Sequence, residues 1–465
     1  MPMKWTASDL VLSIELGRTA RGDRGRTLQH GLRDAVRAGR LASGEVLPGT
    51  RELALALRMA RGTVVEAYEQ LIAEGYLDAR SGSGTVVSPG AARAAADPPG
   101  THPIAPAFAI DLRPGVPDLG SFPADDWAWA LGRAARQATR ADLGYGNAVG
   151  HPFARHAIAA ALRRTRAAET TPSHIVLGSG FAQGVSLVLR ALAEGGARTL
   201  AVEDPGDRSI DPIARGFGME VVGVPVDGEG MDVAALAASP ADAAIVTPAH
   251  QAPTGAVLSP SRRAQLIAWA DRTGGWVLED DYDSEFRYDR QPVGALQGIA
   301  PDRVILLGST SKTHAPAIRL GWVAAPASLL PALTAGKEAA DRGSSALDQY
   351  AFGLLLDSGR HDRHVRAMRA VYKRRRSALV AALAEAAPDL RLTGLDAGFH
   401  GLLRLPAAAD EDAVVRGAAE RSLAVRGLSG FSLAPPAAPT LAVGFGNADE
   451  ERIVAGVRVI ADLTR

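Results

Sequence analysis

The residues best suited to chemistry follow two short apolar runs, 276–278 and 304–307, in the second half of the chain. Acidic and phenolic side chains follow the first run, and hydroxyl side chains, a lysine and an arginine follow the second. These residues are Asp280, Asp281, Tyr282, Ser309, Ser311, Lys312 and Arg319. Apolar runs of this length predict buried parallel strands, which deliver side chains to one site at their carboxyl ends.

This combination of groups suits pyridoxal phosphate. A lysine can close a Schiff base on the aldehyde, a carboxylate can keep the pyridine nitrogen protonated, and an arginine with hydroxyls can hold the phosphate. Taken singly, Lys312 is typical of a solvated surface lysine, Asp280 of a turn or helix cap, and Arg319 of half an ion pair. The order and spacing of the whole set are much harder to obtain by chance.

The same region resembles the fold-type I, aspartate-aminotransferase-like family. The segment EDDYDSEFRY resembles the corresponding segment of the MocR regulators of the GntR superfamily, which fuse such a domain to a DNA-binding head. The resemblance implies a Schiff base on Lys312, an Asp280 pair with the pyridine nitrogen, and a Tyr282 hydrogen bond to the phenolic oxygen. Asp281 replaces Asp280 in that role if the strand register is shifted by one, because neighbouring side chains point to opposite faces. Phosphate contacts are implied for Ser309, Ser311 and Arg319.

The composition bounds the class of protein. The chain has 465 residues, 47% of them hydrophobic and 22% charged, so we expect two or three folded units with a large core. Its 51 basic and 51 acidic residues give a net charge of zero, so any contact with nucleic acid must come from a local surface. The absence of cysteine excludes disulfides, thiolate metal sites and cysteine nucleophiles.

The sequence predicts neither a secretory signal nor a membrane span. Its beginning contains acidic residues and no sustained apolar core. The longest uncharged stretch, 427–448, is interrupted by Pro435, Pro436 and Pro439, which suit a membrane helix poorly. We therefore expect a soluble cytoplasmic protein without a membrane partner.

The first 88 residues predict a small helical domain that ends in a hairpin. Residues 10–16 are interpreted as a short strand, and helical periodicity begins at Leu28. A second helix is expected after Thr50, which is placed to cap it, and a third begins at Arg61. The segment GYLDARSGSGTVVS then predicts two strands joined by a tight glycine turn. Three helices followed by a hairpin are typical of a winged helix-turn-helix, although periodicity alone favours a generic helical bundle with a stray hairpin.

The segment from Gly39 to Val87 resembles the GntR-type head over nearly its whole length. By that match the DNA contacts fall on Arg51, Arg61, Thr63 and Arg80, with Gly82 and Ser83 at the wing tip. Arginine suits such contacts because its planar fork grips phosphate or guanine edges at two points. Gly49 and the pair Met59-Ala60 replace hydroxyl residues that the family usually has, so fewer phosphate contacts are expected there.

Residues 89–109 are interpreted as a linker, because the segment is rich in Ala, Gly and Pro and has little apolar periodicity. Helical patterns then alternate with strand-like runs to the end of the chain, which predicts an α/β architecture for residues 110–465. The resemblance implies a central, mostly parallel sheet and a smaller C-terminal α+β subdomain.

Three further segments match the resembled family. A glycine turn at Ser179, Gly180 and Phe181 lies between a strand-like run and a helix start, where backbone N–H groups can bind the cofactor phosphate. Tyr145 matches the family tyrosine that reaches the neighbouring subunit's cofactor, which implies a homodimer. His250 lies in VTPAHQAPTG, which matches the segment beneath the cofactor ring, and we interpret it as a locally hydrogen-bonded histidine.

Three positions depart from the family. Asp207 replaces an aromatic residue and Ala252 a larger side chain, so we expect the cofactor ring to be less enclosed. Ala442 occupies the place of the arginine that grips an α-carboxylate in aminotransferases. Arg404 and Arg426 are the candidates to replace it from elsewhere in the sequence.

Two functions follow from this pattern. In the first, the chain is a transcriptional regulator whose domain senses an effector, either pyridoxal phosphate itself or an amino compound. It binds as a homodimer to an operator with paired half-sites or repeats, and it is not an enzyme. In the second, it is an active aminotransferase with an accessory head. The head and Ala442 favour the first, and neither function requires a metal. The sequence leaves open the effector identity, the operator and target genes, and activation or repression.

Overall fold

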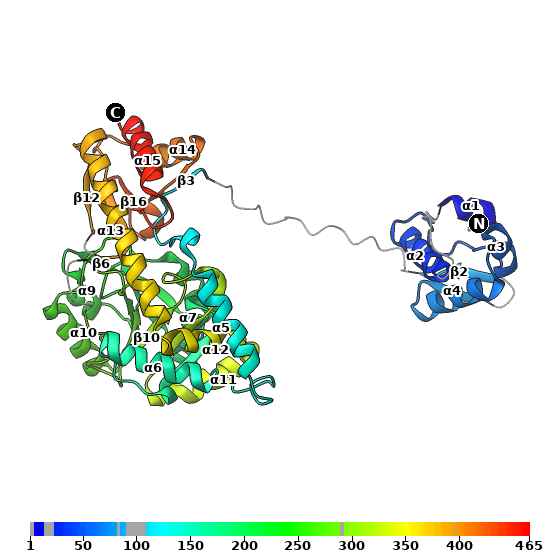
Figure 1. The fold of residues 1–465 in the computed structure, drawn as a ribbon, viewed down its shortest axis with the longest axis horizontal. Coiled ribbons are helices and arrows are strands. Elements are labelled where there is room, and N and C mark those ends of the chain that lie inside the picture. Colours follow the sequence, from blue (N-terminus) through cyan, green and yellow to red (C-terminus); the bar gives the residue numbers. More distant parts are fainter. Residues whose placement is uncertain (1–3, 14–22, 81–83, 90–107, 289–292, 396) are drawn as a thin grey trace. The chain divides into compact units, whose positions relative to one another are not determined.

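A computed structural model describes residues 4–13, 23–80, 84–89, 108–288, 293–395 and 397–465 of the chain (Figure 1). Its contacts divide the chain into two compact units, Met1–Ala105 and Pro106–Arg465. We call the first unit the head and the second the body. No helix in the described ranges is both long and apolar enough to cross a membrane.

The head contains four helices and one hairpin. The helices are α1 (Ala7–Ser13), α2 (Arg24–Arg37), α3 (Thr50–Leu57) and α4 (Arg61–Ala73). In the hairpin, β1 (Leu77–Arg80) pairs antiparallel with β2 (Gly84–Val87). The spacing predicted the buried face of α4 correctly, since Val64, Ala67, Tyr68 and Leu71 all lie in the head core.

The prediction of a strand at residues 10–16 was wrong, because α1 covers Ala7–Ser13 and residues 14–16 lie outside the described ranges. Thr6 and Asp9 cap the start of α1 reciprocally. The Thr6 hydroxyl donates to the Asp9 carboxylate at 2.5 Å and accepts from the Asp9 N–H at 3.2 Å. This capping box stabilises a helix, and Ala7 and Leu10 on one face are buried.

The sequence predicted that Thr50 caps α3, and this prediction was wrong. Thr50 is the first residue of the helix, and Gly49 in the N-cap position has no side chain to accept a hydrogen bond. The Thr50 hydroxyl instead accepts from Arg61 Nε at 3.5 Å, which joins the starts of α3 and α4.

The body is built on an eight-stranded sheet with the order β4-β11-β10-β9-β8-β5-β6-β7. Strands β10, β9, β8, β5 and β6 run parallel, whereas β11, β4 and β7 pair antiparallel with their neighbours. The strands are β4 (Ile175–Gly178), β5 (Thr199–Asp204), β6 (Glu220–Asp227), β7 (Gly230–Met231), β8 (Ala243–Val246), β9 (Trp276–Asp280), β10 (Val304–Ser309) and β11 (Gly321–Ala324). This is the mostly parallel sheet that the sequence predicted.

Helices cover both faces of this sheet (Figure 1). One face packs against α7 (Phe181–Glu194), α8 (Asp211–Gly216) and α11 (Leu330–Asp341). The opposite face packs against α5 (Ala124–Gln137), α6 (Pro152–Arg166), α9 (Val233–Ala238), α10 (Pro260–Thr273) and α12 (Ala346–Asp357). Alternate residues of β10 point to opposite faces of the sheet. Ile305 and Leu307 pack with α7, whereas Leu306 packs with α6 and α12.

The C-terminal part of the body forms a smaller α+β subdomain, as predicted. Its antiparallel sheet has the order β12-β13-β16-β15, and β14 pairs separately with β3. The strands are β3 (Ile110–Asp111), β12 (Arg391–Thr393), β13 (His400–Arg404), β14 (Leu423–Ala424), β15 (Arg426–Gly427) and β16 (Thr440–Gly444). The helices are α13 (Arg360–Ala386), α14 (Glu411–Glu420) and α15 (Glu450–Leu463). Short 3-10 helices of the body are η1 (Leu119–Ser121), η2 (Pro172–His174), η3 (Arg208–Ile210), η4 (Pro316–Ile318), η5 (Ala327–Leu329) and η6 (Leu428–Phe431).

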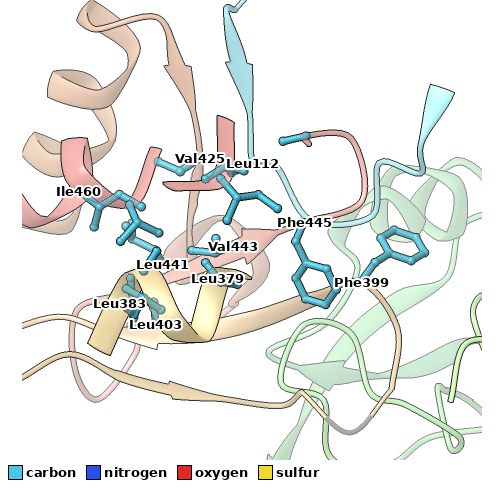
Figure 2. Close-up of a cluster of buried hydrophobic side chains, with 14 of the residues drawn as sticks. Leu112, Leu379, Leu383, Phe399, Leu403, Val425, Leu441, Val443, Phe445 and Ile460 are labelled. Atoms are coloured by element: carbon cyan, nitrogen blue, oxygen red, sulfur yellow. The ribbon is translucent and has the colours of Figure 1, made fainter. Parts of the chain in front are cut away.

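Buried side chains from the subdomain sheet and from α13, α14 and α15 form the hydrophobic core of the subdomain, shown in Figure 2. Leu441 and Val443 of β16 meet Leu379 of α13 and Ile460 of α15. Leu112, just after β3, joins the same cluster, so this core also holds the beginning of the body.

We predict that Leu441→Ala destabilises the body by about 2–5 kcal/mol, because it removes fully buried methyl groups and leaves a cavity. Urea unfolding followed by circular dichroism measures the change. Leu119→Ala is the control, because that leucine is 48% exposed. Equal losses in the two variants would contradict the assignment of Leu441 to the core.

Candidate functional site

Two neighbouring parallel strands bring Asp280 and Lys312 to the same edge of the sheet. Asp280 is the last residue of β9 and lies opposite Leu307 of β10, and Lys312 follows the end of β10. Leu278 packs with α7, so Asp280, two residues further on, faces the α7 side of the sheet. The predicted clustering of these groups is therefore present in the fold.

Lys312 is a half-buried lysine whose amine contacts the beginning of the body. Its Nζ donates to the carbonyl oxygen of Gly115 at 2.6 Å. Gly115 has a positive φ of 77°, and a Cβ there would lie 3.3 Å from Nζ. Burial lowers the pKa of Lys312, although Asp280 and Asp207 act in the opposite direction. The lowered pKa favours the neutral, nucleophilic amine.

Asp280 is a buried carboxyl that lacks a hydrogen-bond donor on one oxygen. Its Oδ1 has no partner among the described residues. Burial raises the pKa of Asp280 well above its usual range, Asp207 and Asp281 raise it further, and Lys312 partly offsets them. A cationic N–H donor beside Oδ1 would stabilise the ionised carboxylate.

Asp281 points to the other side of the sheet. Its Oδ2 accepts from Arg166 Nε at 2.8 Å, and Arg166 also lies 3.9 Å from Glu279. The side chains of Arg166 and Asp281 are buried, 3% and 8% exposed respectively. This geometry favours Asp280 over Asp281 as the group beside Lys312.

Tyr282 belongs to a buried cluster with two histidines and a second aspartate. Its hydroxyl lies 3.0 Å from His250 Nδ1, which lies 2.7 Å from Asp283 Oδ2. Burial lowers the pKa of His250, but Asp283 outweighs burial and leaves it raised. The interpretation of His250 as locally hydrogen-bonded agrees with these contacts.

His400, at the start of β13, completes the cluster. Its ring centre lies 5.0 Å from that of His250, and burial lowers the pKa of His400 well below its usual range. The possible metal-ligand atoms of His250, Asp283 and His400 all lie within 4.8 Å of one another. The short contact between His250 and Asp283 accounts for two of these three groups without an ion.

The glycine turn before α7 faces Arg319. Gly180 is the N-cap residue of α7 with a φ of 91°, and Phe181 is the first helical residue. Arg319 donates from an Nη atom to the Ser179 carbonyl at 2.7 Å, and its own φ of 54° is left-handed. The turn, the helix N-terminus and the guanidinium together form an anion-binding geometry.

A hydrogen-bond network supports this turn from behind. Gln183 Oε1 accepts from the Ser179 N–H at 2.7 Å and from Lys337 Nζ at 3.0 Å. Lys337 also donates to Asp341 at 2.5 Å and to Ser344 at 2.7 Å, and it is fully buried. The network fixes the turn in the shape that presents its backbone N–H groups.

Ser309 is the last residue of β10 and Ser311 immediately precedes Lys312, and the Ser311 N–H donates to the Ser309 hydroxyl at 3.3 Å. Tyr145 is not brought to this site within its own chain. It is 88% exposed, and its neighbour Leu143 is 66% exposed.

Ala442 is fully buried in β16, directly opposite Leu402 of β13 and Arg426 of β15. Arg426 shares a face of the sheet with Ala442, but its guanidinium stacks 4.4 Å from the Phe431 ring and donates to the Gly430 carbonyl at 3.1 Å. Arg404 is exposed at the end of β13.

Asp207 is exposed and caps η3, where it accepts from the Ser209 N–H at 2.9 Å. It is close enough to raise the pKa of Asp280. Ala252 is half-buried in the segment whose Gln251 side chain donates to Glu203 at 3.1 Å. The two departures from the family therefore lie at the edge of the Lys312 site.

In the head, the predicted DNA contacts gather at the starts of α3 and α4. Arg51 and Arg61 are exposed and Thr63 is half-buried. Arg80, at the end of β1, is exposed as well. Gly82 and Ser83 lie outside the described residues.

Sequence reasoning missed residues that join these sites from distant positions. A groove of about 460 Å³ beside Thr63 is lined by Arg24, Arg26 and Arg58. In the body, the sequence did not single out Gly115, Arg166 or Lys337. A basic run in the sequence at residues 18–26 was a signal for Arg24 and Arg26, but no local pattern marks Arg58 or the three residues of the body.

Glu203, near the end of β5, is a buried carboxyl of the body, close enough to raise the pKa of Tyr282. It accepts from the Thr247 hydroxyl at 2.5 Å and from Gln251 Nε2 at 3.1 Å. Burial raises the pKa of Glu203 from 4.5 to about 7, against these hydrogen bonds. The folded state therefore prefers the protonated form, and stability falls as pH rises from 4.5 towards 7.

Between pH 4.5 and 7, ionisation of Glu203 lowers the free energy of unfolding by about 3 kcal/mol. We predict that this decrease is absent in Glu203→Gln, because the amide does not ionise. Urea unfolding at a series of pH values between 4.5 and 7.5 measures the difference. Glu220→Gln, at an exposed position on β6, is the control and should leave the pH dependence unchanged. Parallel curves for the wild type and Glu203→Gln would refute the raised pKa.

Comparison with known proteins identifies both units. The profile described as aminotransferase class I and II matches residues 109–451. The profile described as bacterial regulatory proteins, gntR family, matches residues 25–87. Among solved structures, an archaeal alanine:glyoxylate aminotransferase has a TM-score of 0.71 and 24% identity, over 76% of this chain and 90% of its own. At this identity, the likeness shows the fold alone.

Curated relatives match the head and the body together. The HTH-type pyridoxine biosynthesis transcriptional regulator PdxR of Corynebacterium glutamicum is 35% identical over 91% of this chain and 92% of its own length. The probable rhizopine catabolism regulatory protein MocR of Rhizobium meliloti is 30% identical over 93% of this chain and 92% of its own. The chain therefore belongs to the MocR subfamily of gntR-family transcriptional regulators, which join a helix-turn-helix head to an aminotransferase-like domain.

Proposed function

We propose that the chain regulates transcription by binding DNA with residues 1–88 and sensing a small molecule with residues 110–465, with residues 89–109 as the linker. The body would hold pyridoxal phosphate at Lys312. The observation that carries this proposal is the pairing of Lys312 and Asp280, which meet at the carboxyl ends of two parallel strands. Family membership supports the regulatory role.

The residues at this site fit pyridoxal phosphate. Asp280 has a buried oxygen without a donor, and a protonated pyridine nitrogen is a cationic donor that would satisfy it. Tyr282, beside His250, would donate to the phenolic oxygen of the ring. The lowered pKa of Lys312 suits a lysine that binds an aldehyde covalently. When bound, the cofactor would supply an electron-withdrawing ring.

The phosphate group fits the anion-binding geometry before α7. Gly180 and Phe181 would present backbone N–H groups, Ser179, whose own N–H is held by Gln183, would contribute its hydroxyl, and Arg319 already faces this turn. Ser309 and Ser311 would add hydroxyl donors. Lys337, through Gln183, holds the turn in place rather than touching the phosphate.

The head would bind DNA through Arg51, Arg61, Thr63 and Arg80, with Gly82 and Ser83 at the wing tip. The start of α4 is exposed and carries Arg61, which suits insertion of this helix into the major groove. The groove beside Thr63 adds Arg58 as a contact to the backbone.

The regulator would act as a homodimer on an operator with paired half-sites or repeats. Tyr145 and Leu143 are neighbouring exposed side chains, which suits burial against a second copy of the chain. Tyr145 would then reach the cofactor of that copy. An effector that binds two dimer arrangements with different affinities would shift the balance between them and so change operator binding.

Two classes of effector fit this site. The relative named for pyridoxine biosynthesis supports pyridoxal phosphate itself, and the Lys312 site suits an amino compound. Ala442 argues against ordinary α-amino acids, since no guanidinium grips a carboxylate from this position and Arg426 is stacked on Phe431.

The alternative function is an active aminotransferase with an accessory head, and the fold shared with aminotransferases supports it. Absorption spectra of the cofactor-loaded protein with a panel of amino acids and amines discriminate between the two. Conversion of the cofactor to its amine form with sustained turnover of a keto acid would favour the enzyme. A spectrum that no amino acid converts would favour the regulator.

We predict that Lys312→Ala abolishes covalent attachment of pyridoxal phosphate, because the variant has no amine beside Asp280. Borohydride reduction followed by peptide mass spectrometry should show the added mass on the Lys312 peptide of the wild type only. Lys373→Ala, at an exposed position of α13, is the control and should retain the modification. Attachment that survives in Lys312→Ala would refute the assignment.

We predict that Arg61→Ala weakens DNA binding about tenfold or more, since it removes a charged contact at the start of α4. The probe is a duplex selected by the wild-type protein from a random-sequence library, and affinity is measured by fluorescence anisotropy at fixed salt. Arg40→Ala changes an exposed arginine elsewhere in the head and should stay within about twofold. Equal effects of the two substitutions would contradict an interface at α4.

A further inference from the structure

A second cavity, which we call the rear cavity, lies on the opposite side of the sheet from the Lys312 site. Its volume is about 340 Å³, and it is enclosed by α6, α12 and α13 and by residues at the carboxyl end of β9 and on β10 and β11. Leu306 and Trp322 face α6 and α12, whereas Asp280 faces the α7 side. Asp280 and the rear cavity therefore lie on opposite faces of the sheet, and among the described residues Ser309, the last residue of β10, is the one proposed cofactor residue that also lines the cavity.

One wall of the rear cavity is apolar. Ile158 and Leu162 of α6, Phe352 and Leu356 of α12, and Val365 of α13 line it. Trp322 stacks on Phe352, with ring centres 5.9 Å apart. Such a wall suits the hydrocarbon part of a small ligand.

Buried polar atoms without partners also line the rear cavity. Asp281 Oδ1, Trp322 Nε1 and His361 Nδ1 all lack a hydrogen-bond partner within the described part of the chain. All three residues line the rear cavity, and the Asp281 and His361 side chains are each 8% exposed. The indole N–H donates and the carboxylate oxygen accepts, so an occupant must offer both an acceptor and a donor.

The charges along α13 leave an excess of positive charge at the rear cavity. Arg164 pairs with Asp362 at 2.9 Å, and Arg166 pairs with Asp281. Arg369 donates to the backbone carbonyl of Glu285 at 2.6 Å, which carries no net charge. Arg366 is exposed and forms no ion pair within the described ranges. The Glu285 carboxylate also lines the cavity, 3.4 Å from His361 Nε2, so one net positive charge remains, and Arg366 and Arg369 are the guanidinium groups nearest to carrying it.

We propose that the rear cavity binds a small zwitterion with an apolar side chain, such as an aliphatic α-amino acid. Its ammonium group pairs with Asp281 Oδ1, and its carboxylate is held by Arg366 and Arg369. Its side chain packs on the wall formed by Ile158 and Leu162. This site is separate from Lys312 and involves no reaction with the cofactor.

The position of the rear cavity suits an effector site, a role that rests on the proposed regulatory function. Asp281 immediately follows Asp280, and Ser309 of the cavity lining lies at the end of the strand that leads to Lys312. A ligand here contacts the ends of β9 and β10, which also carry the proposed cofactor residues. The two sites are coupled to the extent that the ligand binds the cofactor-loaded and cofactor-free forms with different affinity.

Isothermal titration of the full-length, cofactor-loaded protein with L-leucine, L-methionine and L-phenylalanine tests the proposal. At least one of them should bind with measurable heat. For leucine, 4-methylpentanoate lacks the ammonium group and 3-methylbutylamine lacks the carboxylate. Each should bind about tenfold or more weakly than leucine, because each loses one charge-assisted contact. Equal affinity of either analogue would overturn the zwitterion assignment.

Substitutions locate the binding site. Arg366→Glu should weaken leucine binding about tenfold or more, and Arg363→Glu, an exposed control on the same helix outside the lining, should stay within about twofold. Ala161→Phe fills the rear cavity from the half-buried face of α6 and should abolish binding. Binding that is insensitive to both Arg366→Glu and Ala161→Phe would overturn the location.

The Lys312→Ala variant separates the two sites. Leucine binding should persist in this variant, and hydrogen exchange should slow in residues 281–285 and 360–369. The absence of binding by all three amino acids would overturn the proposal and leave water as the occupant of the rear cavity. If the wild type did not bind DNA or did not attach the cofactor covalently, that result would count against the proposed function instead. Failure of the rear-cavity proposal and failure of the proposed function are therefore distinguishable.

Discussion

The body depends on how two adjacent buried carboxylates at the end of β9 are neutralised. Asp280 and Asp281 lie in a low-dielectric environment, where an unpaired charge is strongly unfavourable. Because strand residues alternate, the two carboxylates need partners on opposite sides of the sheet. Asp281 finds Arg166 at 2.8 Å, whereas Asp280 has Lys312 as an electrostatic partner and one oxygen without a donor. One side is therefore completed by the protein, and the other has a place for a cationic ligand.

The C-terminal subdomain contributes to the same site through close backbone packing. A Cβ at Gly444 of β16 would lie 2.2 Å from the carbonyl oxygen of Arg113, so glycine lets this segment pack directly against the subdomain sheet. Two residues later, the Gly115 carbonyl accepts from Lys312. The hydrophobic core of Figure 2 therefore fixes both the subdomain and the carbonyl that orients the lysine.

The sequence predicted what is local in the chain and missed what the fold brings together. Asp280, Tyr282 and Lys312 stand in contiguous motifs at strand ends, so their spacing and the resemblance were enough to single them out as candidates. Arg166 and Lys337 contact the site from helices far away in the sequence, and no local pattern marks a buried salt bridge of this kind. The strand predicted at residues 10–16 failed because apolar content outweighed the Thr6–Asp9 capping box, which stabilises a helix through two short hydrogen bonds.

The combination of a complete cofactor site with Ala442 bears on how a regulator arises from an aminotransferase fold. Catalysis requires substrate contacts that strengthen in the transition state, and a carboxylate grip orients the substrate for them. Sensing requires only that a ligand bind two conformations with different affinity, and about 1–3 kcal/mol of coupling free energy is enough. Replacement of an arginine by Ala442 removes the first requirement and leaves the second untouched, since Lys312, Asp280 and Arg319 still hold their positions. A body that lacks this guanidinium can therefore still meet the requirement for sensing, which is the role proposed for it.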